Sequence, residues 1–71
     1  MKTLSDVAAS YDEQAKANEM LAEEILVRVN SFTPEVRENQ RWRADWLMAE
    51  AAGLRARAAE LRRIESRHSM N

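Results

Sequence analysis

Apolar residues recur along this chain at alternating spacings of three and four, which is the pattern of a helix that packs against another helix. In the first half, one series with these spacings comprises Leu4, Ala8, Tyr11, Ala15, Asn18, Ala22, Ile25, Val29 and Phe32. In the second half, a matching series comprises Ala44, Leu47, Ala51, Leu54, Ala58 and Leu61. The pattern therefore predicts two long helices within a single domain that spans residues 1–71.

The convincing break between the two series is a short segment that contains the only proline of the chain. Thr33 can cap a helix that begins at Pro34, because proline suits the first helical position. Ser5, or Thr3 together with Asp6, can cap the first helix. We therefore predict a first helix over about 4–30, a turn at 30–34, a second helix over about 34–66 and a frayed tail over 67–71.

In heptad notation the a positions hold small residues and the d positions hold mostly large ones. If the chain folds back at the turn, three alanine layers form, namely Ala22 with Ala44, Ala15 with Ala51 and Ala8 with Ala58. Three large layers lie between them, namely Asn18 with Leu47, Tyr11 with Leu54 and Leu4 with Leu61. Two helices cannot enclose a core of this kind by themselves. We therefore predict an all-α fold, an antiparallel two-helix hairpin that dimerises into a four-helix bundle.

This alternation of small and large layers over residues 4–61 resembles the Rop proteins, which control plasmid copy number. The resemblance implies a hairpin dimer and, because Rop proteins bind paired RNA loops, a nucleic-acid-binding function. It rests on the packing pattern, and no RNA-contacting residue of that family can be matched to a position in this chain. The size, composition and architecture also resemble the small helical proteins that phages and plasmids encode to inhibit host proteins.

The composition also favours oligomerisation. A chain of 71 residues is short enough to need disulfides, a metal or a second copy, and it contains no cysteine and one histidine. Residues 1–36 carry three basic and seven acidic side chains, whereas residues 37–71 carry eight arginines and five acidic side chains. The two halves therefore attract each other. With no apolar stretch of about 18 residues and no signal-peptide layout, we expect a cytoplasmic protein without a membrane partner.

Two tryptophans, Trp42 and Trp46, lie off the a/d series at outer heptad positions. A strip of small residues continues from them along the same side of the helix. Together with a neighbouring arginine this surface resembles a protein-binding hot spot. The predicted partner-binding residues are Trp42, Arg43, Trp46, Ala49, Gly53 and Ala56. Two alternatives stay open, since the strip could instead be the dimer seam, or the rings could fold over the hairpin end onto Phe32 and Val36.

The arginines of the second helix are spread over several heptad positions, with acidic residues between them. Arg41, Arg55 and Arg62 fall on e positions, while Arg43 and Arg57 fall on g positions. We expect them to pair with acidic residues of the first helix, or along their own helix, as Arg62 could with Glu65. Nucleic-acid binding needs uncompensated positive charge and is the weaker alternative. The polar Asn18 at a d position is expected to fix the register of the seam.

Enzymatic and metal chemistry find little support in the sequence. Glu65 and His68 have the Glu-x-x-His spacing of carboxylate-bridged metal bundles, but the motif occurs once and lies near the end of the chain. A nucleophile–base pair would have to join His68 to Ser66 or Ser69. A single glycine excludes a glycine-rich phosphate loop. We therefore expect no catalytic activity, no metal and no cofactor.

Together these features predict a homodimeric, non-enzymatic adaptor or inhibitor that covers a surface of a larger protein, for example a host regulatory or defence protein. A Rop-like nucleic-acid-binding dimer is one alternative. The other is a structural coiled-coil component of a larger assembly.

Overall fold

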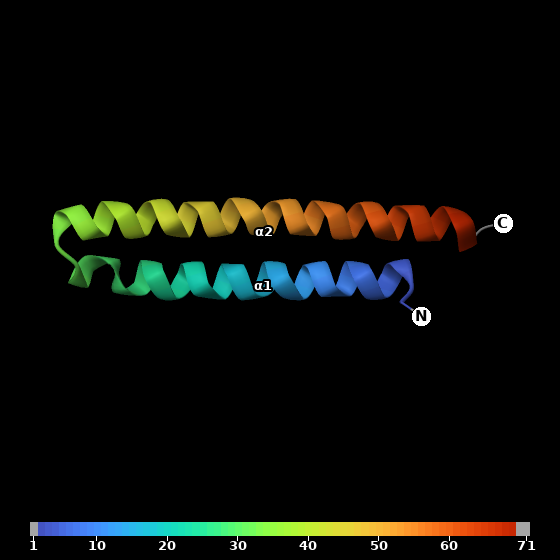
Figure 1. Ribbon diagram of the computed structural model, residues 1–71, viewed down its shortest axis with the longest axis horizontal. Helices are drawn as coiled ribbons and strands as arrows, with labels where there is room; N and C mark the ends of the chain where they lie inside the picture. Colours follow the sequence, from blue (N-terminus) through green and yellow to red (C-terminus); the bar gives the residue numbers. More distant parts are fainter. Residues whose placement is uncertain (1, 70–71) are drawn as a thin grey trace.

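The computed structural model describes residues 2–69 of the chain. It consists of α1 (Leu4–Arg28), the short 3₁₀ helix η1 (Val29–Ser31) and α2 (Pro34–Ser69). The two long helices run antiparallel and pack against each other along a rod of 58 × 16 × 15 Å (Figure 1). The predicted all-helical hairpin is thus confirmed. Neither helix within residues 2–69 combines the length and the apolar composition of a membrane span.

The first helix begins where the sequence predicted a cap. The Oγ1 atom of Thr3 accepts a hydrogen bond from the backbone N–H of Asp6 at 3.1 Å. In return, the Oδ2 atom of Asp6 accepts one from the backbone N–H of Thr3 at 3.2 Å. This reciprocal capping box satisfies two backbone donors that the first helical turn would otherwise leave unpaired.

The turn is closed by an arginine of α2. Pro34 begins that helix, as predicted. The backbone N–H of Arg37 donates to the carbonyl of Thr33 at 2.8 Å, and its Nη2 atom donates to the carbonyl of Phe32 at 3.3 Å. Arg37 lies one heptad before Ala44, so the small-residue series of α2 ends in a side chain that reaches back to the connection.

The helix boundaries differ from the predicted ones by a few residues. α1 ends at Arg28, after which η1 tightens the chain before the turn. α2 continues to Ser69, three residues beyond the predicted end, because no glycine or proline interrupts it after Gly53. Part of the predicted frayed tail is therefore helical, while Met70 and Asn71 lie outside the described residues. α2 extends past the beginning of α1 (Figure 1).

The centre of the helix–helix contact is a seam of small residues at the a positions. The six a-position alanines are between 0 and 1% exposed; they are Ala8, Ala15, Ala22, Ala44, Ala51 and Ala58. Ala22 and Ala44 belong to one buried cluster with Leu47, against which Ile25 packs. The predicted alanine layers are therefore confirmed as buried, and that cluster confirms the predicted register at the layer of Ala22 and Ala44.

The d positions are covered much less completely than the a positions. Leu47 is 7% exposed. The other d residues of the predicted core range from half-buried to exposed: Tyr11, Asn18, Ile25, Leu54 and Leu61 are half-buried, and Leu4 is 36% exposed. Among residues 2–68 no large side chain is fully buried and no polar or charged residue is buried, so Asn18 is not enclosed within this hairpin. The single hairpin therefore encloses small side chains and leaves the large ones partly in water.

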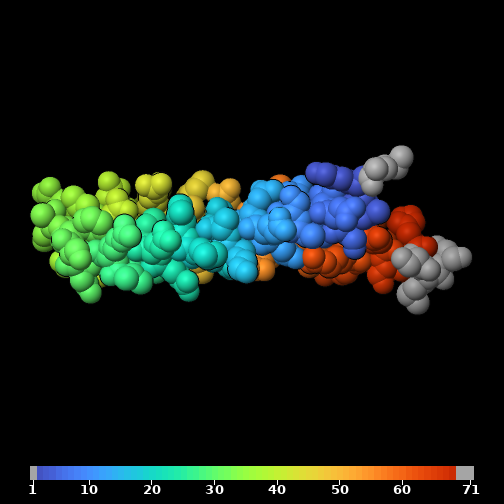
Figure 2. Space-filling view, turned by 90° about the horizontal axis from the view of Figure 1, so that it is seen from below, coloured from blue at the N-terminus to red at the C-terminus, as the bar shows by residue number. Residues whose placement is uncertain are grey.

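The two helices wind about each other over their length. In the space-filling view, which faces α1, atoms of α2 show along the upper edge near the turn and mainly along the lower edge toward the termini (Figure 2). This geometry accompanies the heptad spacing, because a repeat of 3.5 residues keeps one face in contact when the helices wind about each other.

Candidate functional site

The two tryptophans lie on the outer surface of α2. Trp42 is 68% exposed and Trp46 is 54% exposed. Because they are four residues apart in a continuous helix, their rings are neighbours on one side of it. Their exposure contradicts the alternative in which both rings fold over the hairpin end, where Val36 is itself 42% exposed. We call the exposed surface that Trp42 and Trp46 form the tryptophan face.

The small residues predicted beside the tryptophans continue this surface toward the C-terminal end. Ala49, Gly53 and Ala56 are all exposed. A Cβ atom added at Gly53 would meet no atom within 4 Å, so the hairpin itself does not need glycine at this position. The strip is therefore smooth and unpartnered within the chain.

Arg43 is placed differently from the rest of the predicted set. Its side chain lines a hollow between the helices near the turn, together with apolar residues that include Leu21, Ile25 and Phe32. Since Arg43 precedes Trp46 by three residues, it lies on the adjoining side of α2. The structure thus groups Trp42, Trp46 and the small residues, and it puts Arg43 at the border of that group.

Several exposed apolar side chains near the turn were not predicted as part of a site. Among the described residues, the large apolar side chains that are exposed besides Leu4 and the tryptophans are Met20, Leu21, Leu26, Val27, Val36 and Met48. Val27 is the most exposed of them, at 83%. Met20 and Met48 line a common hollow. Like the tryptophans, they are large apolar residues off the a/d series, and this is the sequence signal that marks them.

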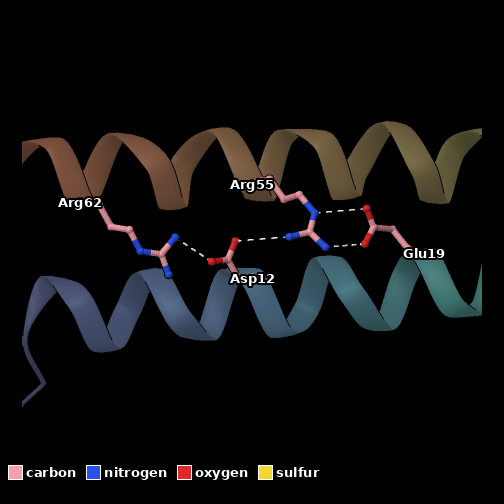
Figure 3. A network of polar contacts seen from close by, with 4 residues as sticks. All are labelled: Asp12, Glu19, Arg55 and Arg62. Carbon is pink, nitrogen blue, oxygen red and sulfur yellow. Dashed lines mark hydrogen bonds and ion pairs between the residues drawn. The ribbon is translucent and has the colours of Figure 1, made fainter.

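Ion pairs join the two helices in the other half of the hairpin (Figure 3). Arg55 lies between two acidic residues of α1, with its Nη2 atom 2.5 Å from Glu19 Oε1 and its Nη1 atom 3.8 Å from Asp12 Oδ1. The Nη1 atom of Arg62 lies 2.7 Å from Asp12 Oδ2. Side chains of alternating charge therefore form a ladder in the order Arg62, Asp12, Arg55, Glu19, and we call it the ion-pair ladder.

The ladder shifts the titration of two of its members. The hydrogen bond from Arg55 lowers the pKa of Glu19, and partial desolvation of the carboxylate opposes this change. The same hydrogen bond and the charge of Glu19 raise the pKa of Arg55. Both shifts favour the charged forms, so the pair is ionised throughout the physiological range. Because both groups remain in contact with solvent, the contribution to stability is small.

For Arg55 and Arg62, the ladder confirms the expectation that arginines at e positions pair with acidic residues of the first helix. Arg62 reaches across to Asp12, whereas the sequence suggested a pairing with Glu65 along its own helix. Arg63 forms a further ion pair with Glu60, three residues earlier. These contacts neutralise part of the positive charge of α2. A surface that tracks phosphates needs uncompensated arginines, and these ion pairs remove Arg55, Arg62 and Arg63 from that set.

The motif at the end of α2 does not assemble a recognisable centre. His68 is exposed and Glu65 is half-buried. Within residues 2–69, no three side chains of His, Asp or Glu come together in a group that could hold a metal ion.

Comparison of the chain with models of known protein families, with curated proteins and with solved structures finds no match in any of the three. The resemblances to Rop proteins and to small phage and plasmid inhibitors therefore stay predictions. The function must be argued from the surface of the hairpin.

Proposed function

We propose that this chain is a small, non-enzymatic, cytoplasmic adaptor or inhibitor that acts as a homodimeric four-helix bundle. The tryptophan face binds a larger protein, and the mechanism is steric, since the bound bundle covers a surface that its target needs. The resemblance to phage and plasmid inhibitors suggests a host regulatory or defence protein as that target. The observation that carries the proposal is the exposure of Trp42 and Trp46, at 68% and 54%.

The physical argument concerns what exposed tryptophans usually do. A large aromatic ring in water forgoes the free energy of burial, and contiguous exposed apolar surface marks sites of interaction. Tryptophan also dominates the residues whose truncation costs the most binding energy at protein interfaces. The two neighbouring rings do not contribute to the helix–helix seam, because buried alanines on another side of α2 form it. A protein partner gives these rings an apolar environment.

The experiment has two stages. Tagged protein is first used to capture partners from a candidate host lysate, with and without nuclease, and each captured protein is purified. Its affinity is then measured for the wild type, Trp42→Ala, Trp46→Ala and a control, Val27→Ala, which removes a more exposed apolar side chain from α1. We expect each tryptophan variant to lose affinity by roughly 2 kcal/mol or more, while the control stays within about 0.5 kcal/mol.

Three results would contradict the proposal. Loss of every partner after nuclease treatment would favour a nucleic-acid binder. Equal effects of Val27→Ala and Trp42→Ala would remove the tryptophan face from the interface. Indefinite association of the pure protein, in place of a discrete dimer, would favour a structural coiled-coil component.

A further inference from the structure

The two flanks of the alanine seam differ in chemistry. On one flank the e-position residues Asp12, Glu19, Arg55 and Arg62 form the ion-pair ladder, and we call this the closed flank. On the other flank lie the d residues and, next to them, the g residues. We call it the open flank, because most of its half-buried side chains are large and apolar; they are Val7, Tyr11, Ile25, Phe32, Leu54, Leu61 and Ile64, and the half-buried polar residues among them are Asn18 and Gln40.

Three hollows follow one another along the open flank. The first lies near the turn and is lined by Leu21, Ile25 and Phe32 among others. The second lies over the middle of α2, beside Gly53 and Leu54. The third lies near the termini and includes Val7, Tyr11 and Leu61. All their lining residues hold d, g or c positions, so the hollows form one interrupted groove along one side of the hairpin.

A hollow on the other side has a different lining. Near the turn, Met20 and Met48 border a hollow whose remaining residues, Lys16, Glu19 and Glu23, are all charged. Beyond it the ion-pair ladder covers the seam (Figure 3). The hollows of the open flank also contain charged residues, but large apolar side chains recur along its whole length, whereas on the closed flank they are confined to the end near the turn.

The surface area of the hairpin indicates how much surface a partner should cover. The chain exposes 5654 Å². A compact monomer of 8.2 kDa exposes about 4,500 Å². The excess is about 1,100 Å² per chain, or about 2,200 Å² for two chains. Stable protein interfaces bury about 1,200–2,000 Å² in total, and those of obligate homodimers bury more. The excess therefore matches what a stable dimer buries.

We propose that a second copy of this chain covers the open flank, so that the closed flank and Trp42 stay outside the dimer seam. Each copy then inserts its large d residues between those of the other, and the alanine layers remain within each hairpin. The inference rests on the proposed dimer and not on the proposed protein target. It also means that each copy in the dimer leaves its Trp42 exposed.

Charge favours a second copy over an unrelated partner. The g residues of α2 on the open flank alternate in sign, in the order Arg43, Glu50, Arg57. A two-fold axis that crosses α2 between Glu50 and Arg57 brings each Glu50 opposite the Arg57 of the other copy, which makes the surface self-complementary. In addition, other copies of the chain are present as soon as it is synthesised, so they are available to bury the large apolar side chains of the open flank.

The test uses two leucines of α1 that have similar exposure and lie on opposite flanks. Leu21 is 44% exposed and lines a hollow of the open flank. Leu26 is 46% exposed and lies one heptad after Glu19, on the other flank. The dimer dissociation constants of the wild type, Leu21→Lys and Leu26→Lys are measured by analytical ultracentrifugation. We expect Leu21→Lys to raise the constant by roughly tenfold or more, and Leu26→Lys by less than about threefold.

A second, milder pair keeps the test decisive if Leu21→Lys does not fold. The chain has no cysteine, so Leu21→Cys and Leu26→Cys each introduce a single thiol. Its rate of maleimide labelling is measured above and below the concentration at which the dimer dissociates. We expect dimerisation to protect the thiol at position 21 and to leave the one at position 26 unprotected.

Two results would overturn the inference, and they are distinguishable. If the wild type stays monomeric at micromolar concentration, both the dimer and the assignment of the open flank as its interface are wrong. A dimer that Leu26→Lys dissociates at least as strongly as Leu21→Lys, with protection at position 26, would put the second copy on the closed flank. Neither result depends on whether Trp42→Ala weakens the binding of the proposed protein target.

Discussion

The two halves of this hairpin share one seam but differ in what they leave at the surface. In the terminal half, residues 2–19 and 49–69, acidic side chains of α1 pair with arginines of α2, and the outer face of α2 carries alanines and Gly53. In the turn half, residues 20–48, large apolar side chains point into water. Of the large apolar residues exposed within the described part of the chain, all except Leu4 lie in this half.

The difference does not come from the packing of the helices. Ala8, Ala15, Ala51 and Ala58 line the seam of the terminal half, as Ala22 and its partners do in the turn half, and all are buried to the same extent. Since the same seam supports both halves, the apolar surface near the turn is not a requirement of the hairpin. The turn half therefore holds most of the exposed large apolar side chains. In the terminal half the ion-pair ladder joins the helices, and the large apolar side chains other than Leu4 are half-buried.

The largest effect on the free energy of unfolding should come from substitutions in the seam, which test whether it is packed alike in both halves. Ala15→Leu and Ala22→Leu each add a large side chain where the wild-type alanine is 0% exposed. Overpacking should force the helices apart and destabilise both variants by about 1–3 kcal/mol or more. Urea unfolding at equal protein concentration measures the change, because a dimer's stability depends on concentration. A large loss in one half and none in the other would show that the seam is not uniform.

A smaller and opposite effect is expected on the outer face of the terminal half. Gly53→Ala adds a methyl group that would meet no atom within 4 Å, at a helical position with ordinary backbone geometry. Alanine should therefore stabilise the protein by about 0.5–1 kcal/mol, through helix propensity and a less flexible unfolded chain. Thermal unfolding measures this gain.

The matched control for Gly53→Ala is Ala56→Gly, a reverse change at an exposed position three residues away. It should destabilise the helix by a similar amount. Gly53 borders the middle hollow of the open flank. If Gly53→Ala instead lowered the stability of the pure protein, the second copy would have to pack closely against Gly53, and the strip of small residues would belong to the dimer seam.

The smallest effect concerns the acid stability that the ion-pair ladder gives to the terminal half. Because the pKa of Glu19 is lower in the folded protein than in the unfolded chain, its contribution is complete above the unfolded-state value, about 4.3. It is lost as the pH falls through the folded-state pKa. The raised pKa of Arg55 contributes in the opposite direction, with a loss only at strongly alkaline pH.

Urea unfolding between neutral and acid pH measures this dependence. Glu19→Gln should flatten the acid side of the curve, and Arg55→Gln should do the same. The double variant should differ little from either single variant, since both remove one interaction. Added salt should reduce all these differences, because the pair is exposed to solvent. Additive effects of the two substitutions would mean that the contact between Arg55 and Glu19 does not act as a pair in solution.

The spacing of residues, together with the break at Pro34, predicted the hairpin and the register observed at Ala22 and Ala44. An α-helix has a local period, so alternating spacings of three and four define one face before any partner is known. Alanines recur every seven residues on that face in both helices, and the position of the turn selects, among the registers that match small with small, the one observed at Ala22 and Ala44. The N-terminal cap of α1 could also be predicted from the sequence, since Thr3 and Asp6 interact within one helical turn.

Other features depended on how far each helix is rotated about its own axis, which the spacing of residues does not define. The sequence treats a and d positions as equal members of the seam, whereas in the structure Ala15 is at its centre and Tyr11 is turned partly outward. The same rotation brings Asp12 and Glu19 against Arg55 and places Trp42 in water. The sequence thus determined which residues form the contact between the helices. Only the tertiary structure decided which flank is closed and which is left open, because that choice depends on two rotations and on long-range side-chain contacts.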